Sequence, residues 1–356
     1  MEYIPYDYKK AENIAKRTAA FYDAPVGKAL IQIRSCDSLN IPKMPPLNSF
    51  SFPADMEKYL DMRAGKEYMF LRFHESIDDD FIPSVSPWYG IAEHTAFLGG
   101  KVDFTPDTTF QHKICDDIED CKNLTLDKDN MWVHLVAGGI KYLREKWGKY
   151  IPVRMRGADG PSDIANAVRG EDIFYDIYDD PDALGKLLDF CAEAVNFTLD
   201  LQRAEATEIA GGRLTGFGMW MPGKCMGQLS DDFSTMVSPD TYEELFLPYL
   251  EKCVAGCDMA MLHTHSLGQK ILPLFAKVEK IRLIELSSDP NSDRAVEVFR
   301  KYHNVLENKN VIVAPTYDEL CNMDDLLKSS KTVIWYYAKD EDDARHALDA
   351  VEKYRF

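Results

Sequence analysis

The sequence predicts an α/β fold, a (β/α)8 TIM barrel preceded by a short N-terminal helical segment. Two observations indicate it. Short runs rich in β-branched and apolar residues alternate with longer segments of helical apolar spacing along most of the 356 residues. The competing fold, a doubly wound open sheet, lacks its glycine-rich fingerprint, because Gly216-Phe-Gly218 is only a fragment of that motif.

The expected barrel strands are short apolar runs bounded by turn residues. In chain order they are 29–34, 81–85, 151–155, 216–220, 259–263, 281–285, 310–314 and 332–336. The expected helices between them are 56–73, 131–147, 181–205, 239–254 and 341–354. Pro181 and Pro239 support two of the helix starts, since each lies near a first turn with an acidic neighbour.

The chain has no internal repeat, low-complexity tract or Pro/Gly linker, so we expect one domain over residues 1–356. Hydrophobic residues make up 46% and charged residues 28% of the chain, which is typical of a globular protein with a sizeable core. The net charge of −18 disfavours binding to nucleic acid or to an acidic membrane face.

The cysteines predict a reducing compartment. The chain has 8 of them, without CxxC pairs or the short regular spacings of a disulfide scaffold. The N-terminus lacks the basic flank and apolar core of a signal peptide, and no apolar run is long enough to span a bilayer. We therefore expect a cytoplasmic protein.

The strongest candidate for chemistry is His263-Thr-His265, at the end of the apolar run Met259-Ala-Met-Leu262. In a strand, alternate residues share a face, so both imidazoles would emerge together at the carboxyl end. Two adjacent imidazoles suit a metal or an anionic substrate. The plainer interpretation is a hydrogen-bonded histidine at a strand end.

A catalytic zinc usually has three protein ligands, so a third is needed. Candidates are Glu285, at the end of the sixth expected strand, Cys225, Cys321 or an aspartate. Cys225 fits the role of third ligand because it would lie in the loop after the fourth expected strand, 216–220.

Other polar and aromatic residues are expected at the carboxyl ends of the strands, where barrel enzymes build their active sites. Asp78, Asp79 and Asp80 form a solvated turn or supply a carboxylate that acts beside Arg34. Arg154 and Arg156 form a carboxylate or phosphate clamp or pair with acidic residues. Trp220 and Trp335 are pocket walls or core residues, and Tyr337 leaves the last strand beside Trp335. These three aromatic residues, with Arg154, Arg156 and Asp163, are the candidate substrate-binding residues.

Several stretches resemble the uroporphyrinogen decarboxylase superfamily. They are Gly157-Ala-Asp-Gly-Pro-Ser-Asp163, 170–182, Leu229-Ser-Asp-Asp-Phe233, 238–242 with Pro248-Tyr249, and 80–90. The resemblance runs from about Arg34 to the C-terminus and implies a (β/α)8 barrel. The superfamily includes porphyrinogen decarboxylases and zinc methyltransferases, which move methyl groups between corrinoid proteins and thiols or methylated substrates.

The match to the decarboxylases is incomplete. Arg34 resembles their first-strand arginine, but Ser38 replaces a second one, and Asp80, or Asp79 in a shifted register, resembles their essential aspartate. Ser162-Asp163 and Tyr336-Tyr337-Ala338 replace an expected tyrosine and histidine. The resemblance therefore disfavours haem-pathway decarboxylation.

The methyltransferase branch holds zinc with a His-x-Cys strand end, which His263-Thr-His265 resembles with a histidine in the thiolate position. We expect a divergent methyltransferase that moves a methyl group between a small methylated substrate and a corrinoid protein. His263 and His265, with Glu285 or Cys225, would bind zinc, and Asp80 and Trp220 would position the substrate. The resemblance also allows a homodimer.

Two alternatives stay open. One is a metal-free decarboxylase, in which Asp80 stabilises a cation and Arg34 holds a carboxylate. The other is a non-catalytic barrel that binds a ligand or docks on a corrinoid carrier.

Overall fold

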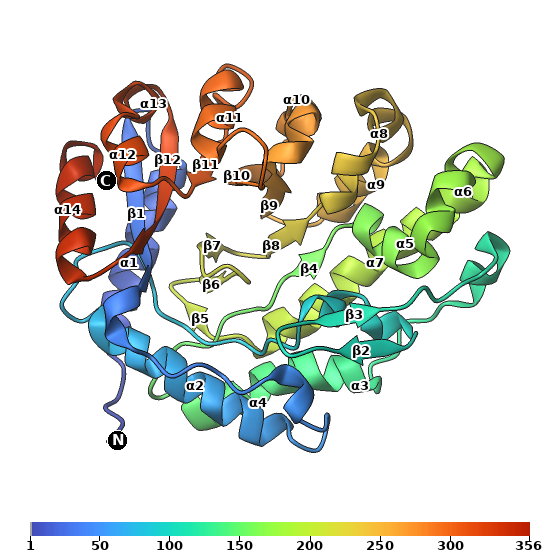
Figure 1. Cartoon of the computed structure of the whole chain (residues 1–356), viewed down its shortest axis with the longest axis horizontal. Helices are drawn as coiled ribbons and strands as arrows, with labels where there is room; N and C mark the ends of the chain where they lie inside the picture. The colour runs from blue at the N-terminus through green and yellow to red at the C-terminus, as the bar shows by residue number, and fades with distance from the viewer. Residues whose placement is uncertain (1) are drawn as a thin grey trace.

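The computed structural model describes residues 2–356, and its centre is a seven-stranded parallel sheet of order β1-β12-β11-β10-β9-β8-β4. The strands are β1 (Lys28–Cys36), β4 (Ala158–Asp159), β8 (Cys225–Ser230), β9 (Met259–His265), β10 (Ile281–Ser287), β11 (Asn310–Val313) and β12 (Lys331–Ala338). They follow an arc, with helices on its outer side (Figure 1). The predicted α/β class is confirmed, and five predicted strands match β1, β9, β10, β11 and β12.

Between β1 and β4 the arc is closed only by extended segments that make isolated hydrogen bonds with their neighbours. Val85 forms an isolated parallel bridge with Val153, and Asp80 N donates to Ile31 O of β1 at 2.7 Å. The expected second and third strands thus run as extended segments. Pro83 and Pro152 lie within them and remove ladder donors. The ladder is therefore continuous over seven strands, not eight.

The prediction of a strand at 216–220 is wrong. Thr215 O accepts from Gly218 N at 2.9 Å, which makes a turn with Gly218 at φ +79°. Trp220 begins β7 (Trp220–Pro222), which joins β5 (Glu208–Ile209) and β6 (Gly212–Leu214) in a small antiparallel sheet. The parallel strand at this point is β8, which escaped prediction because polar Gln228 and Ser230 interrupt its apolar pattern. A separate hairpin comprises β2 (Val102–Phe104) and β3 (Thr109–Gln111).

The helices follow the prediction closely, and α2 (Met56–Phe73) and α7 (Pro181–Glu205) have the predicted bounds. The segment 131–147 contains α3 (Met131–Val133), a π turn and α4 (Gly139–Trp147), and 239–254 contains α8 (Pro239–Leu245) and α9 (Leu247–Val254). The expected N-terminal helix is α1 (Tyr8–Tyr22), and the last helix is α14 (Glu341–Val351). The others are α5 (Pro161–Arg169), α6 (Ile173–Asp179), α10 (Leu272–Lys277), α11 (Ala295–Lys301), α12 (Tyr317–Cys321) and α13 (Asp324–Ser329).

The sheet gives the site a rigid base. Every residue of β11 and the first four of β9 are buried, so the middle of the sheet is core. Because the strands are parallel, their carboxyl ends meet at one edge. Among residues 2–356, no helix combines the length and apolar character needed to cross a membrane.

Candidate metal centre

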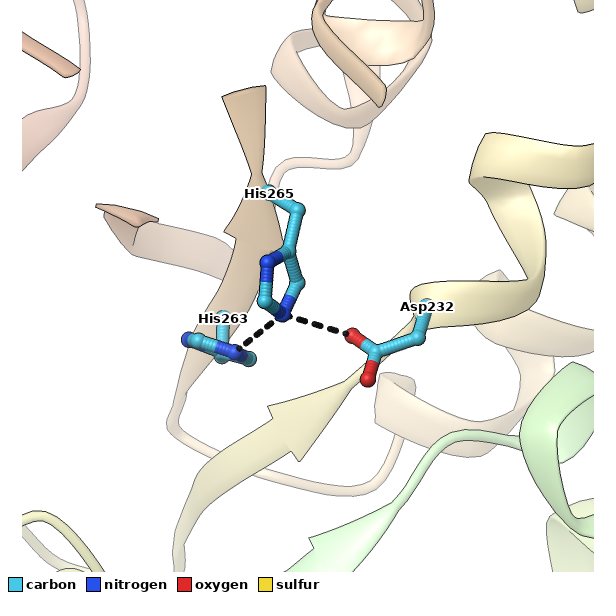
Figure 2. A group of neighbouring side chains, drawn as sticks. All are labelled: Asp232, His263 and His265. Carbon is cyan, nitrogen blue, oxygen red and sulfur yellow. Dashed lines mark hydrogen bonds and ion pairs between the residues drawn. The ribbon is translucent and has the colours of Figure 1, made fainter. Parts of the chain in front are cut away.

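His263 and His265 face each other at the carboxyl end of β9. Their Nε2 atoms lie 3.1 Å apart, as Figure 2 shows. Asp232 approaches from the 3-10 turn Asp232–Met236, which follows β8, and its Oδ1 lies 3.5 Å from His265 Nε2. One ligand atom from each of the three residues lies within 4.8 Å of the other two. The sequence prediction that the two histidines share a face is confirmed.

A carboxylate orients each imidazole. Glu285 is in register with His263 on β10, and its carboxylate contacts His263 Nδ1. Asp289, just beyond β10, contacts His265 Nδ1 at 2.7 Å. Each Nδ1–H thus has its own acceptor, which directs the Nε2 lone pairs toward each other. Two lone pairs at 3.1 Å repel unless a proton or a cation lies between them.

Asp289 is itself held in place. Its Oδ2 accepts from Leu267 N at 2.9 Å and from Ser266 Oγ at 3.2 Å. Burial is the largest single influence on the pKa of His263 and lowers it, but the hydrogen bond with Glu285 and the charges of Glu285, Asp232 and Asp159 together outweigh burial, so the net shift is upward. The histidines therefore have the second layer of hydrogen bonds that usually accompanies metal-binding imidazoles.

The three residues fit a zinc-like cation. Tetrahedral bonds of about 2.0–2.1 Å place ligand atoms roughly 3.3–3.4 Å apart. The distances of 3.1 Å between the imidazoles and 3.5 Å from His265 to Asp232 lie on either side of that value. Three protein ligands would leave a fourth position open, as in catalytic zinc sites.

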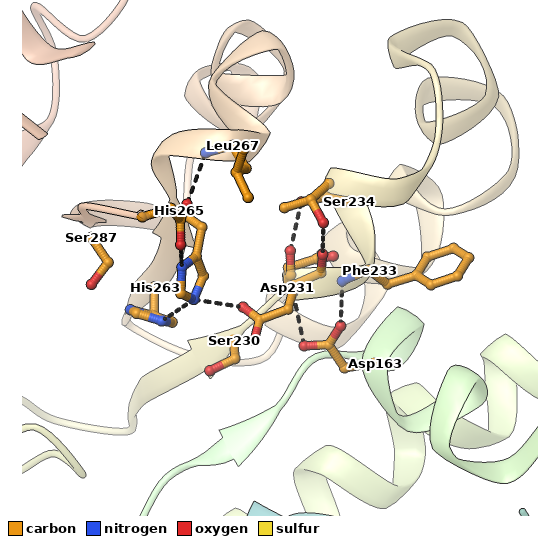
Figure 3. A network of polar contacts seen from close by, with 12 residues as sticks. Asp163, Ser230, Asp231, Phe233, Ser234, His263, His265, Leu267 and Ser287 are labelled. Atoms are coloured by element: carbon orange, nitrogen blue, oxygen red, sulfur yellow. Dashed lines mark hydrogen bonds and ion pairs between the residues drawn. The ribbon is translucent and has the colours of Figure 1, made fainter. Parts of the chain in front are cut away.

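A buried network fixes the backbone of Asp232 (Figure 3). Asp163, from α5, accepts from Asp232 N at 3.0 Å and from Phe233 N at 2.7 Å. Asp231 accepts from Ser162 Oγ at 2.7 Å and contacts the hydroxyl of Tyr242. Burial raises the pKa of Asp231 to about 6 and that of Asp163 well above its usual range.

A cavity of about 440 Å3 opens beside the cluster of Asp232, His263 and His265. Its wall includes Arg156, Asp159, Phe217, Asp232 and His263. Arg156 forms an ion pair with the fully buried side chain of Glu93. Phe217 presents its ring edge-on to His263, with centroids 5.2 Å apart. The cavity size suits a small molecule.

Two predicted substrate-binding residues, Arg156 and Asp163, line this cavity, whereas the others lie elsewhere. Trp220 is buried in the small sheet, where its Nε1 donates to Ile209 O at 2.7 Å. Arg154 donates to Gly216 O at 3.2 Å and to Ser84 O. Tyr337 is 58% exposed on β12.

Arg34 and Trp335 form a layer next to the cavity. The Arg34 guanidinium lies between the rings of Phe81 and Trp335, 4.6 Å from each centroid, and donates to Phe217 O at 2.6 Å. Burial lowers the pKa of Arg34. Arg34 therefore supports the wall residue Phe217.

Asp79 and Asp80 bind the backbone of β1. Asp79 Oδ2 accepts from Ile33 N and Asp80 Oδ2 from Ile31 N, each at 2.8 Å. Asp80 Oδ1 also lies 2.6 Å from Arg17 of α1. These carboxylates replace ladder acceptors on the open side of β1, and neither lines the cavity.

The structure does not bring Cys225 to the histidines. Cys225 pairs with Met259 at the start of β9, whereas Ser230, at the other end of β8, pairs with His263. Cys225 is completely buried. Asp232 takes the place of Cys225 as the third ligand candidate, and Glu285 orients His263 from behind. Sequence reasoning missed Asp232, whose signal was a pair of aspartates directly after a buried strand.

Comparison with known proteins finds similarity both in sequence and in fold. No protein-family model matches the chain. Over 81 residues the chain is 35% identical to the methylcobamide:CoM methyltransferase MtbA of Methanosarcina mazei, a match that covers 23% of this chain and 23% of that relative. The match thus spans less than a quarter of the curated relative. A solved structure of a methyltransferase from Methanosarcina mazei has a TM-score of 0.63 and 14% identity, with 96% of this chain and 98% of that chain covered. The chain therefore shares its fold with that structure over nearly its full length.

Proposed function

We propose that this protein is a methyltransferase that moves a methyl group between a small methylated substrate and a corrinoid carried by a partner protein, with zinc at His263, His265 and Asp232. The observation that carries the proposal is the pair of facing imidazoles, 3.1 Å apart, beside a cavity at the carboxyl edge of the sheet. The local likeness to MtbA supports the reaction class.

Zinc bound there would act as a Lewis acid on a methylated oxygen, nitrogen or sulfur. Two imidazoles and a carboxylate donate less electron density to the metal than a ligand set that includes a thiolate, so the zinc would stay more electrophilic. The chain's residues supply the rest. Glu285 and Asp289 keep both Nδ1–H groups bound, so both Nε2 lone pairs are available. Phe217 shields one side of His263 from water.

The decarboxylase alternative receives less support. It needs a free Asp80 and a free Arg34, but both are engaged by the protein. Asp80 binds Ile31 N and Arg17, and Arg34 binds Phe217 O.

The test combines metal analysis with a methyl-transfer assay. Protein purified without chelators is analysed for metal, then mixed with free methylcobalamin and a small thiol while the cobalamin spectrum is followed. We expect about one metal ion per chain and loss of the methylcobalamin spectrum. His263→Ala and Asp232→Ala should lose both, and Cys225→Ser should keep both. Failure of the metal-loaded protein to demethylate methylcobalamin, alone or with a corrinoid protein, would contradict the proposal.

A further inference from the structure

The cavity has a further acidic group, Asp159 of β4, two strands away from His263. Asp159 of β4 pairs with Ser230 of β8, which pairs with His263 of β9, so the three residues form one row across the sheet. Registered neighbours point to the same face, and strands lie about 4.8 Å apart. The backbones of Asp159 and His263 are therefore roughly 10 Å apart, and both side chains line the same cavity.

Asp159 is the carboxylate of this cavity that no protein group binds directly. Within residues 2–356 its carboxylate forms no hydrogen bond and no ion pair. The other charged wall residues have partners. Arg156 is paired with Glu93, and Asp163 accepts from two backbone amides. Outside the cluster of Asp232, His263 and His265, the cavity therefore carries a net negative charge.

The pKa of Asp159 agrees with this lack of a bonded partner. Burial, followed by the charge of Asp232, raises the pKa of Asp159 to about 7, which is the cost of a carboxylate without a counter-ion.

We propose that the cavity binds a small methylated cation, an ammonium or sulfonium compound, with Asp159 as its counter-ion and Phe217 as its aromatic wall. A quaternary ammonium or sulfonium centre has no N–H to donate, so a carboxylate and an aromatic ring are the groups that recognise it. An anion would meet the unbalanced carboxylate. This inference deepens the proposed function by naming its substrate class, but binding alone tests it.

The probe is choline, compared with its neutral isostere 3,3-dimethylbutan-1-ol and the anion 3,3-dimethylbutanoate. Isothermal titration calorimetry of the full chain should give choline at least about tenfold tighter binding than the alcohol and show no binding of the anion. Asp159→Asn should remove the preference for choline, and Asp159→Glu should retain most of it. The matched control is Asp107→Asn, an exposed carboxylate in the turn between β2 and β3, which should leave binding unchanged.

Circular dichroism and metal content establish that each variant is folded. Equal binding of choline and the alcohol, absence of choline binding, or a choline preference that survives in Asp159→Asn would overturn the inference. The outcome is separable from the proposed function. Selective choline binding without methyl transfer would support the cation site and count against the methyltransferase, and turnover without choline selectivity would do the reverse.

Discussion

Glu285 lies behind His263, in register with it on the neighbouring strand, and its carboxylate binds the imidazole nitrogen that faces away from the cluster. Because Glu285 fixes the tautomer and orientation of the ring, Glu285→Gln should lower metal affinity by about 10- to 100-fold without abolishing binding. Competition with a chromophoric chelator measures the change. The control is Glu279→Gln, an exposed residue before β10, which should have no effect. Unchanged affinity in Glu285→Gln would show that His263 needs no support.

Asp163 should matter for both stability and metal binding. Asp163→Ala removes the acceptors of two backbone amides at the turn that carries Asp232, so we expect about 1–2 kcal/mol of destabilisation and weaker metal binding. Asp232→Ala is the contrast, because it should lose metal while keeping the stability of the metal-free protein. Urea unfolding with and without chelator separates the two effects. Equal stability of the two metal-free variants would rule out the anchoring role of Asp163.

Asp80→Ala should damage the fold more than the metal site. It leaves Ile31 N without its acceptor and Arg17 without its carboxylate partner. Because the Arg17 side chain is 30% exposed, we expect a cost of about 2 kcal/mol. Chemical denaturation should show this loss, while metal stoichiometry of the folded fraction stays that of the unmodified chain. Full stability combined with lost activity would instead assign Asp80 a role in chemistry.

Lys309 gives a pH-dependent prediction away from the site. Burial lowers its pKa from 10.5 to about 8, and its Nζ donates to Val278 O at 2.8 Å. Between those pH values the unfolded chain holds more protons at this position, so stability rises with pH. Below pH 8 the folded state carries the full cost of the buried charge.

The comparison is with Lys309→Met, which removes the titrating group. From pH 7 to pH 10 the free energy of unfolding of the unmodified protein should rise relative to the variant by on the order of 1–2 kcal/mol. Urea unfolding at intervals of pH measures the difference. If the stability of the two proteins changed with pH in parallel, the pKa of Lys309 would not be lowered in the folded chain.

The sequence predicted the elements whose pattern is local. The strands β9, β11 and β12 contain continuous apolar runs, β10 is apolar except for Arg282, Glu285 and Ser287, and α7 begins with a proline after the capping residue Asp180. The adjacency of His263 and His265 follows from strand periodicity alone.

The parts that depend on long-range contacts escaped prediction. Cys225 and Asp232 lie near opposite ends of β8, and a shift of the fourth strand from 216–220 to 225–230 decides which of them reaches the histidines. The pairing of Asp79 and Asp80 with β1 amides depends on segments far apart in the chain. No local pattern distinguishes a carboxylate that completes a sheet from one that performs catalysis.

The part of the arc between β1 and β4 is bonded differently from the rest of the sheet. Proline-containing segments there meet their neighbours through isolated bonds, whereas every other junction is a ladder. The arc thus has one seam that is held by fewer backbone hydrogen bonds than the ladders between its strands. Arg156 directly follows the second of these segments, 151–155, and Asp159 lies three residues further on, in β4. Both residues line the cavity. We therefore expect backbone amides along this seam to exchange with solvent faster than those of β9, which carries His263 and His265.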